Sequence, residues 1–141
     1  TPEDVVAFPG RIVRLHDSIA RVAAPRPGAS RHIARVILTA AAADPAIRSA
    51  MNIACSEPII AQCRTAGLRI AEFSRADEPP DVREIEGSTL EWGTRQAIAA
   101  FGAVPDVIFD RGGPGKEPMI RVLGADPMAV ARKLLRIAGQ A

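Results

Sequence analysis

The segment Asp110–Lys116 carries the residue types in this sequence that are best suited to chemistry. An apolar run ends at Asp110, and glycines follow at positions 112, 113 and 115 before Lys116. Glycines let backbone N–H groups approach an anion closely, and the lysine adds a positive charge. The spacing is not that of a Walker A loop, because a strand rather than a helix is expected to follow. Two interpretations stay open: an anion-binding loop, or a glycine-rich hairpin between Phe109 and Met119.

A second candidate is the segment Gly28–His32. Ser30 is a favourable N-cap, so Arg31 and His32 would lie in the first turn of a helix, where free N–H groups favour anions. His32 could hydrogen-bond a phosphate oxygen there, although a surface histidine fits the pattern equally well. The residues around Arg11 give no comparable local reason to expect a site. Its position is typical of an arginine on an edge strand.

A third candidate is the segment Arg75–Pro79, which follows an apolar run. Arg75 and Glu78 would lie at the carboxyl end of a strand, where α/β sheets commonly bind ligands. An acidic solvated loop is the alternative. Asn52 on a predicted buried strand is a weaker candidate, and Trp92 is more typical of core packing.

Several classes of site are disfavoured by composition and spacing. Ser-His-Asp order, metal-binding helix motifs and dinucleotide fingerprints are absent, and two histidines with two cysteines give no zinc-ligand spacing. We therefore expect Cys55 and Cys63 to be reduced and mostly buried, and the sequence identifies no metal ligands. The net charge is +2, and only 4% of residues are aromatic, which disfavours direct nucleic-acid binding. Sixteen of the 18 basic residues are arginines, which bind phosphate with a fixed fork, although genomic composition also explains most of them.

The hydrophobic pattern predicts a single layered α/β domain, with a mixed β-sheet and helices packed on it. We expect Ser88 or Thr89 to cap the helix that runs to about Phe101, with Glu91 in a capping box if Ser88 is the cap. A short helical turn is expected at Asp44–Pro45, and a loop or lid at 74–87. The expected strands are 11–15, 18–24, 51–55, 68–73, 107–109 and 119–123, and the expected helices are 31–43, 57–66, 88–101 and one starting at 126–127.

The length of 141 residues fits one domain, and no apolar run approaches the roughly 20 residues of a membrane helix. No signal peptide is evident at the amino end. We therefore expect a cytoplasmic protein without membrane contact. Because the chain starts at Thr1, we expect a processed product or a domain excised from a longer chain.

Taken together, these segments resemble the ThiN-type thiamine-phosphate synthase domain, found mainly in archaea and often fused behind a hydroxymethylpyrimidine kinase. The resemblance spans nearly the whole chain in order. One departure is that family members usually carry a further strand upstream of position 1. The matching stretches are 10–12, 28–35, 47–53, 75–79, 87–89, 92–93, 105–108 and 115–124.

The resemblance implies that hydroxymethylpyrimidine diphosphate and hydroxyethylthiazole phosphate are joined to give thiamine phosphate and pyrophosphate. It implies that Arg11 and His32 are catalytic. Mg²⁺ could accompany the diphosphate, and no other cofactor is implied. The substrate-binding residues that we expect are Arg31, Asn52, Arg75, Glu78, Asp110, Gly113, Gly115, Lys116, Glu117 and Met119.

A second class of function stays open at this point. Related domains fused to helix-turn-helix modules sense thiamine phosphate without turning it over. The retained Arg11 and His32 favour the enzyme. Further expected partners are the two phosphorylated substrates, a second copy of the chain, and a fused kinase or helix-turn-helix domain upstream.

Overall fold

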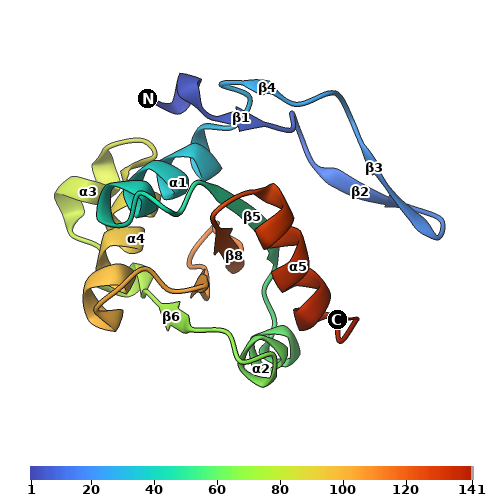
Figure 1. Cartoon of the computed structure of the whole chain (residues 1–141). Helices are drawn as coiled ribbons and strands as arrows, with labels where there is room; N and C mark the ends of the chain where they lie inside the picture. The colour runs from blue at the N-terminus through green and yellow to red at the C-terminus, as the bar shows by residue number, and fades with distance from the viewer. Residues whose placement is uncertain (141) are drawn as a thin grey trace.

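A computed structural model describes residues 1–140, and a four-stranded mixed sheet lies at its centre (Figure 1). The strands are β5 (Ser49–Ala54), β8 (Met119–Gly124), β7 (Val107–Asp110) and β6 (Ile70–Glu72), in that order across the sheet. Strands β6 and β7 are parallel, whereas β5–β8 and β7–β8 are antiparallel. The predicted mixed sheet is therefore confirmed.

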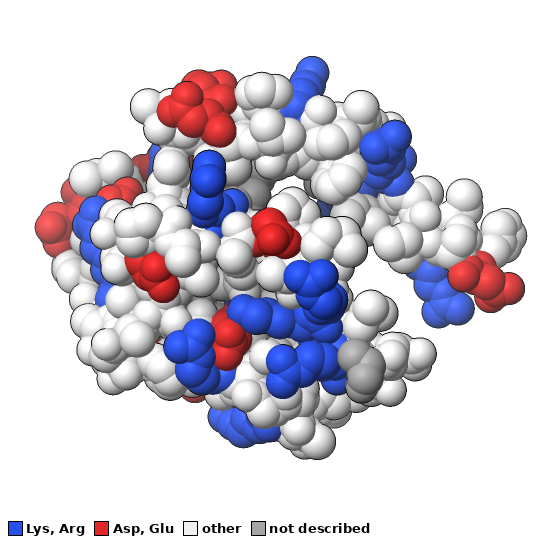
Figure 2. Space-filling view, viewed as in Figure 1, with Lys and Arg blue, Asp and Glu red and all other residues white. Residues whose placement is uncertain are grey.

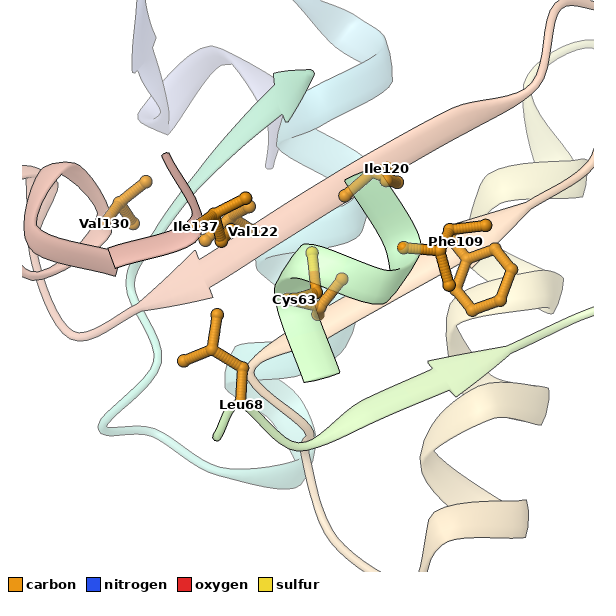
Figure 3. Close-up of a cluster of buried hydrophobic side chains, with 9 residues drawn as sticks. Cys63, Leu68, Phe109, Ile120, Val122, Val130 and Ile137 are labelled. Atoms are coloured by element: carbon orange, nitrogen blue, oxygen red, sulfur yellow. The ribbon is translucent and has the colours of Figure 1, made fainter. Parts of the chain in front are cut away.

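Helices cover both faces of this sheet, as the layered α/β prediction requires. Helices α1 (Arg31–Ala43) and α4 (Ser88–Phe101) pack on one face, and α2 (Glu57–Thr65) and α5 (Pro127–Ile137) pack on the other. Side chains alternate between the faces along each strand, so Ile120 and Val122 meet α2 and α5 while Leu123 meets α1 and α4. Each face therefore has its own hydrophobic core. Figure 3 shows the core between the sheet and helices α2 and α5, which consists of Ile60, Cys63, Leu68, Val107, Phe109, Ile120, Val122, Val130 and Ile137.

Local sequence signals explain most helix ends. Ser56 and Asp126 cap α2 and α5 by accepting hydrogen bonds from the backbone N–H groups of Ile59 and Ala129. The cap predicted for α4 is wrong: Gly87, in the left-handed region at φ 78°, is the N-cap. Ser88 instead donates hydrogen bonds to the carbonyls of Val82 and Ile85, which ties α4 to the segment before it.

Three further expectations about local structure need correction. The segment 74–87 is not a plain loop, since it contains the 3₁₀ turn η2 (Arg75–Asp77) and helix α3 (Pro80–Glu84). Asp44–Pro45 forms a turn rather than a helix, and the Asp44 carboxylate accepts from the N–H of Ala46. The second expected strand ends at Arg21, three residues early.

An arm projects from the sheet and helices (Figure 1). Its hairpin consists of β2 (Ile12–Leu15) and β3 (Ser18–Arg21), and it joins the body through the short pair β1 (Val6–Ala7) and β4 (Arg26–Pro27), next to the 3₁₀ turn η1 (Pro2–Asp4). The arm exposes large apolar side chains, including Ile19 at 76% and Val22 at 69% of their surface. Its apolar surface therefore lacks a partner within residues 1–140.

Other features of the described chain agree with the sequence. Both cysteines are free, and Cys63 is buried in the core. Trp92 packs edge-on against Phe73, as its predicted core role requires. None of the helices in residues 1–140 has both the length and the apolar character to cross a membrane. Figure 2 shows basic side chains gathered over α2 and α5, and acidic ones toward α3.

Candidate functional site

Two of the candidate segments, those that follow β6 and β7, meet at one edge of the sheet. Because β6 and β7 are parallel, the segments after them, which begin at Phe73 and Arg111, leave the sheet on the same side. Met119 at the start of β8 pairs with both Asp110 and Ala54, so the end of β5 and the start of β8 lie at this edge too. Ligand sites in α/β sheets occur at such an edge, beyond the carboxyl ends of parallel strands.

The amino ends of two helices flank the same edge. The hydroxyl of Thr89, at the start of α4, donates to Glu78 in the segment after β6. Arg35 of α1 donates from Nη1 to the carbonyl of Glu86, at 2.9 Å, just before α4. The Arg35 side chain therefore links α1 to the start of α4, and the free N–H groups at a helix amino end favour anions.

Asp110 is the centre of a buried ionic cluster. One carboxylate oxygen, Oδ1, accepts from Nε of Arg75 at 2.7 Å and from the N–H of Gly112 at 2.9 Å. The other, Oδ2, accepts from Nη1 of Arg121 at 2.8 Å. Burial acts to raise the pKa of Asp110, but the hydrogen bonds from both arginines outweigh it and hold the pKa below its ordinary value. Asp110 is therefore an ionised carboxylate shared by two guanidinium groups.

Arg121 is the functional candidate that the sequence interpretation missed. It lies in the middle of β8, 3% exposed, on the face covered by α1 and α4. Its guanidinium carbon is 5.5 Å from the centre of the Phe73 ring, within the range of a cation–π contact. Burial lowers the pKa of Arg121, and the ion pair with Asp110 opposes that effect, so the guanidinium stays protonated. The available signal was one arginine inside an otherwise apolar strand, where a buried charge requires a partner.

Glu78, another expected site residue, is held by protein groups. Its side chain is nearly buried, it accepts a hydrogen bond from Thr89, and Nε of Arg83 lies 3.8 Å from Oε2. This network connects the segment after β6 to α3 and α4. Glu78 therefore supports the shape of the site edge.

The glycine segment forms the hairpin that the sequence left open as an alternative. Gly113 and Lys116 exchange backbone hydrogen bonds of 3.1 and 2.9 Å, with Pro114 and Gly115 at the tip. The N–H groups of Gly112, Gly113 and Lys116 therefore donate to protein acceptors and are not free to bind an anion. The hairpin also approaches Arg75: a Cβ added at Gly113 would lie 3.9 Å from the Arg75 Cδ. Arg75, Asp110 and Gly113 are thus brought together.

We predict that Gly112→Ala damages this hairpin far more than Gly115→Ala. Both glycines have positive φ, so either alanine suffers left-handed strain of about 1–2 kcal/mol. The Gly112 side chain would in addition overlap the Lys116 carbonyl oxygen, whereas nothing lies within 4 Å at Gly115. Such overpacking costs about a further 1–3 kcal/mol. Urea unfolding of both variants measures the difference, and equal losses would contradict the backbone contact.

The other expected residues lie on the surface. Arg31 and His32 are exposed in the first turn of α1, and Asn52 is exposed on β5 opposite Arg121. Lys116 and Glu117 are exposed in the hairpin, and Met119 is half-buried at its end. Among residues 1–140 none of these makes a side-chain hydrogen bond or ion pair.

Arg11 is not brought to the cluster around Asp110. It is exposed just before β2, on the projecting arm, without a hydrogen bond or ion pair to the described residues. None of the expected site residues lines the groove of about 740 Å³. It is lined by residues of α1 and α4, among them Arg35, Glu91 and Arg95.

Comparisons with known proteins agree with this architecture. The model of the family described as thiamine-phosphate synthase ThiN matches residues 1–136. Thiamine-phosphate synthase ThiN of Methanothermobacter thermautotrophicus is 42% identical over 136 residues, covering 96% of this chain and 72% of that protein. The bifunctional thiamine biosynthesis protein ThiDN of Methanocaldococcus jannaschii is 44% identical over 133 residues, covering 94% of this chain and 30% of that protein.

A solved structure has the same fold. The crystal structure of the C-terminal domain of phosphomethylpyrimidine kinase superposes with a TM-score of 0.91 at 36% identity, covering 97% of this chain and 77% of that one. The family match, the identities and the shared fold extend over nearly all of the chain. The chain belongs to the thiamine-phosphate synthase ThiN family.

Proposed function

We propose that this domain is a thiamine-phosphate synthase, a transferase that joins hydroxymethylpyrimidine diphosphate to hydroxyethylthiazole phosphate and releases pyrophosphate. Membership of the ThiN family over residues 1–136 is the observation that carries this proposal. The sheet edge at Asp110 supports it, because two arginines share one carboxylate there and leave a net positive charge for a phosphorylated substrate.

The reaction suits a site without a protein nucleophile. The thiazole nitrogen supplies the electron pair that forms the new bond to the pyrimidine methylene carbon. The bond from that carbon to the diphosphate oxygen breaks, and pyrophosphate leaves with its electron pair. The protein must hold two phosphorylated molecules in line and stabilise the charge that develops on the leaving group. Exposed arginines and a histidine in the first turn of a helix suit that task.

We assign the leaving diphosphate to Arg11 and His32, in keeping with the family resemblance. Both side chains are exposed, so both are accessible to a substrate. We propose Mg²⁺ only as a companion of the diphosphate. Among the described residues, no group of three His, Cys, Asp or Glu side chains is placed to hold a metal ion.

Two partners follow from the relatives. The bifunctional ThiDN protein and the structure described as the C-terminal domain of a kinase both resemble this domain. We therefore propose a kinase that supplies the pyrimidine diphosphate as the functional partner of this domain, in the cytoplasm. No observation favours the alternative of a non-catalytic sensor joined to a helix-turn-helix module.

We also propose that two copies pair through the arm. The arm carries exposed apolar side chains and Arg11, Arg14, Arg21 and Arg26, whereas the segment 77–86 is rich in carboxylates. Opposite charges on these two surfaces favour contact between copies. In sedimentation experiments Ile19→Glu should shift the protein to monomer, whereas Met128→Glu, at an exposed apolar residue of α5, should not. A monomeric wild type would reject the pairing.

A coupling assay tests the function. Purified protein is mixed with both phosphorylated precursors, and thiamine phosphate and pyrophosphate are measured together. Equal amounts of the two products support the synthase. Tight binding of thiamine phosphate without any turnover would reject the synthase and favour the non-catalytic sensor.

A further inference from the structure

The cluster around Asp110 contains more positive charge than its protein partners neutralise. The side chains of Arg75 and Arg121 are 15% and 4% exposed, and the single carboxylate between them is fully buried. Each arginine uses one nitrogen on that carboxylate, and the rest of residues 1–140 offers neither guanidinium another acceptor. Most buried polar groups in proteins have a hydrogen-bond partner, so the remaining N–H donors of these arginines call for a partner other than residues 1–140.

The unpaired nitrogens are accessible. Within the described residues, only Thr94 Oγ1 is a buried side-chain polar atom without a hydrogen-bond partner. The free nitrogens of Arg121 are therefore not sealed in the core, although the rest of the side chain is. Each of them keeps a small solvent-accessible area, through which a ligand atom can approach.

Packing fixes the orientation of Arg121. Its guanidinium lies over Phe73, whose ring is contacted edge-on by Trp92 at a centroid distance of 6.2 Å. On the α4 side the ring meets Gly93 so closely that any Cβ there would overlap it. A donor held in this way needs little reorganisation when an anion binds.

We propose that Arg121 and Arg75 together bind a phosphoryl group of a substrate, and that Asp110 is the residue that positions them. This inference rests on the proposed function. A phosphoryl oxygen pair matches the fork of a guanidinium, and its charge balances the positive excess. In this proposal Asp110 is not a substrate ligand, because its side chain is fully buried and faces Arg75, Gly112 and Arg121.

The phosphoryl group has two sources in this reaction. It is either the monophosphate of the thiazole, which stays in thiamine phosphate, or the diphosphate of the pyrimidine, which leaves as pyrophosphate. In the first case, mutation of the arginines weakens binding of the thiazole phosphate and of thiamine phosphate. In the second case, it weakens binding of the pyrimidine diphosphate and of pyrophosphate. Affinities for thiamine phosphate and for pyrophosphate therefore distinguish them.

The test replaces the arginine fork but keeps the charge. Arg121→Lys should fold. If the group bound is the thiazole monophosphate, the KM for the thiazole phosphate should rise, and the affinity for thiamine phosphate fall, at least tenfold. If it is the pyrimidine diphosphate, the KM for that substrate and the affinity for pyrophosphate should change by the same factor instead. Arg75→Lys, at a more exposed side chain, should change the same KM and affinity and keeps the test valid if Arg121→Lys does not fold. Calorimetry measures the affinities, and the coupling assay measures both KM values.

A matched control lies at the other end of β7. There Asp106 accepts hydrogen bonds from Nε and Nη2 of Arg69, and Nζ of Lys133 lies 2.8 Å from its Oδ1. Arg69→Lys alters the same kind of ion pair. It should leave both KM values and the affinities for thiamine phosphate and pyrophosphate unchanged.

Two results would overturn the inference and leave the proposed function standing. In the first, Arg75→Lys and Arg121→Lys fold, are active and keep the KM values and affinities of the wild type. In the second, Arg69→Lys changes these KM values and affinities as much as Arg121→Lys does. An inactive wild type would reject the proposed function alone. Binding of pyrophosphate or thiamine phosphate by that protein, and its loss in Arg121→Lys, would still support the phosphoryl site.

Discussion

Replacing Arg11 or His32 by alanine should lower turnover about 100-fold or more, the scale of deleting one preorganised donor from an active site. The charge on the leaving diphosphate develops as its bond to carbon breaks. Interactions with it are therefore strongest in the transition state, and their loss appears in kcat. Thiamine phosphate lacks the diphosphate, so both variants should bind it within about tenfold of the wild type.

The controls use the same residue types elsewhere on the surface. Arg132 on α5 and His16 in the turn of the arm are both exposed. Arg132→Ala and His16→Asn should keep full turnover, and asparagine tolerates the left-handed backbone at position 16, where φ is 54°. Turnover and product affinity are measured on folded preparations with the same melting temperature. Full activity in both Arg11→Ala and His32→Ala would reject their assigned roles.

Replacing Asp110 by alanine should be the most destabilising single change in the site. The carboxylate is fully buried, and its removal leaves Arg75 and Arg121 close together without a counter-charge. Removing one partner of a buried ion pair costs about 3–5 kcal/mol. Urea unfolding at pH 7 measures the loss. Asp106→Ala is the matched control and should cost less, because that carboxylate is 14% exposed and its partner Arg69 is 53% exposed.

The pH dependence of stability provides an independent check. The pKa of Asp110 is lower in the folded protein than in the unfolded chain, so the carboxylate stabilises the fold above its unfolded pKa of about 3.9. That stability is lost as the pH falls through the folded pKa. In Asp110→Asn the free energy of unfolding should therefore fall less between pH 5 and the acid range than in the wild type. A parallel decline in both proteins would contradict the ion pairs of Asp110.

The fold class could be predicted because its signals are local. Ser56 and Asp126 stand where helix caps are needed, and Gly67 and Gly102 follow helices in the left-handed region. The segment 74–87 was predicted wrongly because prolines and carboxylates are typical of loops. Proline also suits the first turn of a helix, and Pro80 begins α3.

The site could be predicted only in part. The segments after β6 and β7 were recognised from their position after strands, and the parallel pairing brings Arg75 and Asp110 together. Arg121 was missed because its partners depend on strand pairing across the sheet, which no local pattern encodes. The same holds for Arg11: its place on a projecting arm depends on the β1–β4 pair, which is too short to predict.

The order of strands in the sheet has a consequence for how the chain folds. Strand β8 is synthesised last but lies between β5 and β7, and Ser49 at the start of β5 pairs with Gly124. Such distant pairing requires a large loop to close, which slows folding. Until β8 leaves the ribosome, β5 has no partner in the sheet, and its backbone groups form an open edge that promotes aggregation. A chain that ends before Met119 should therefore aggregate rather than fold, because the sheet is complete only once residues 119–124 have been synthesised.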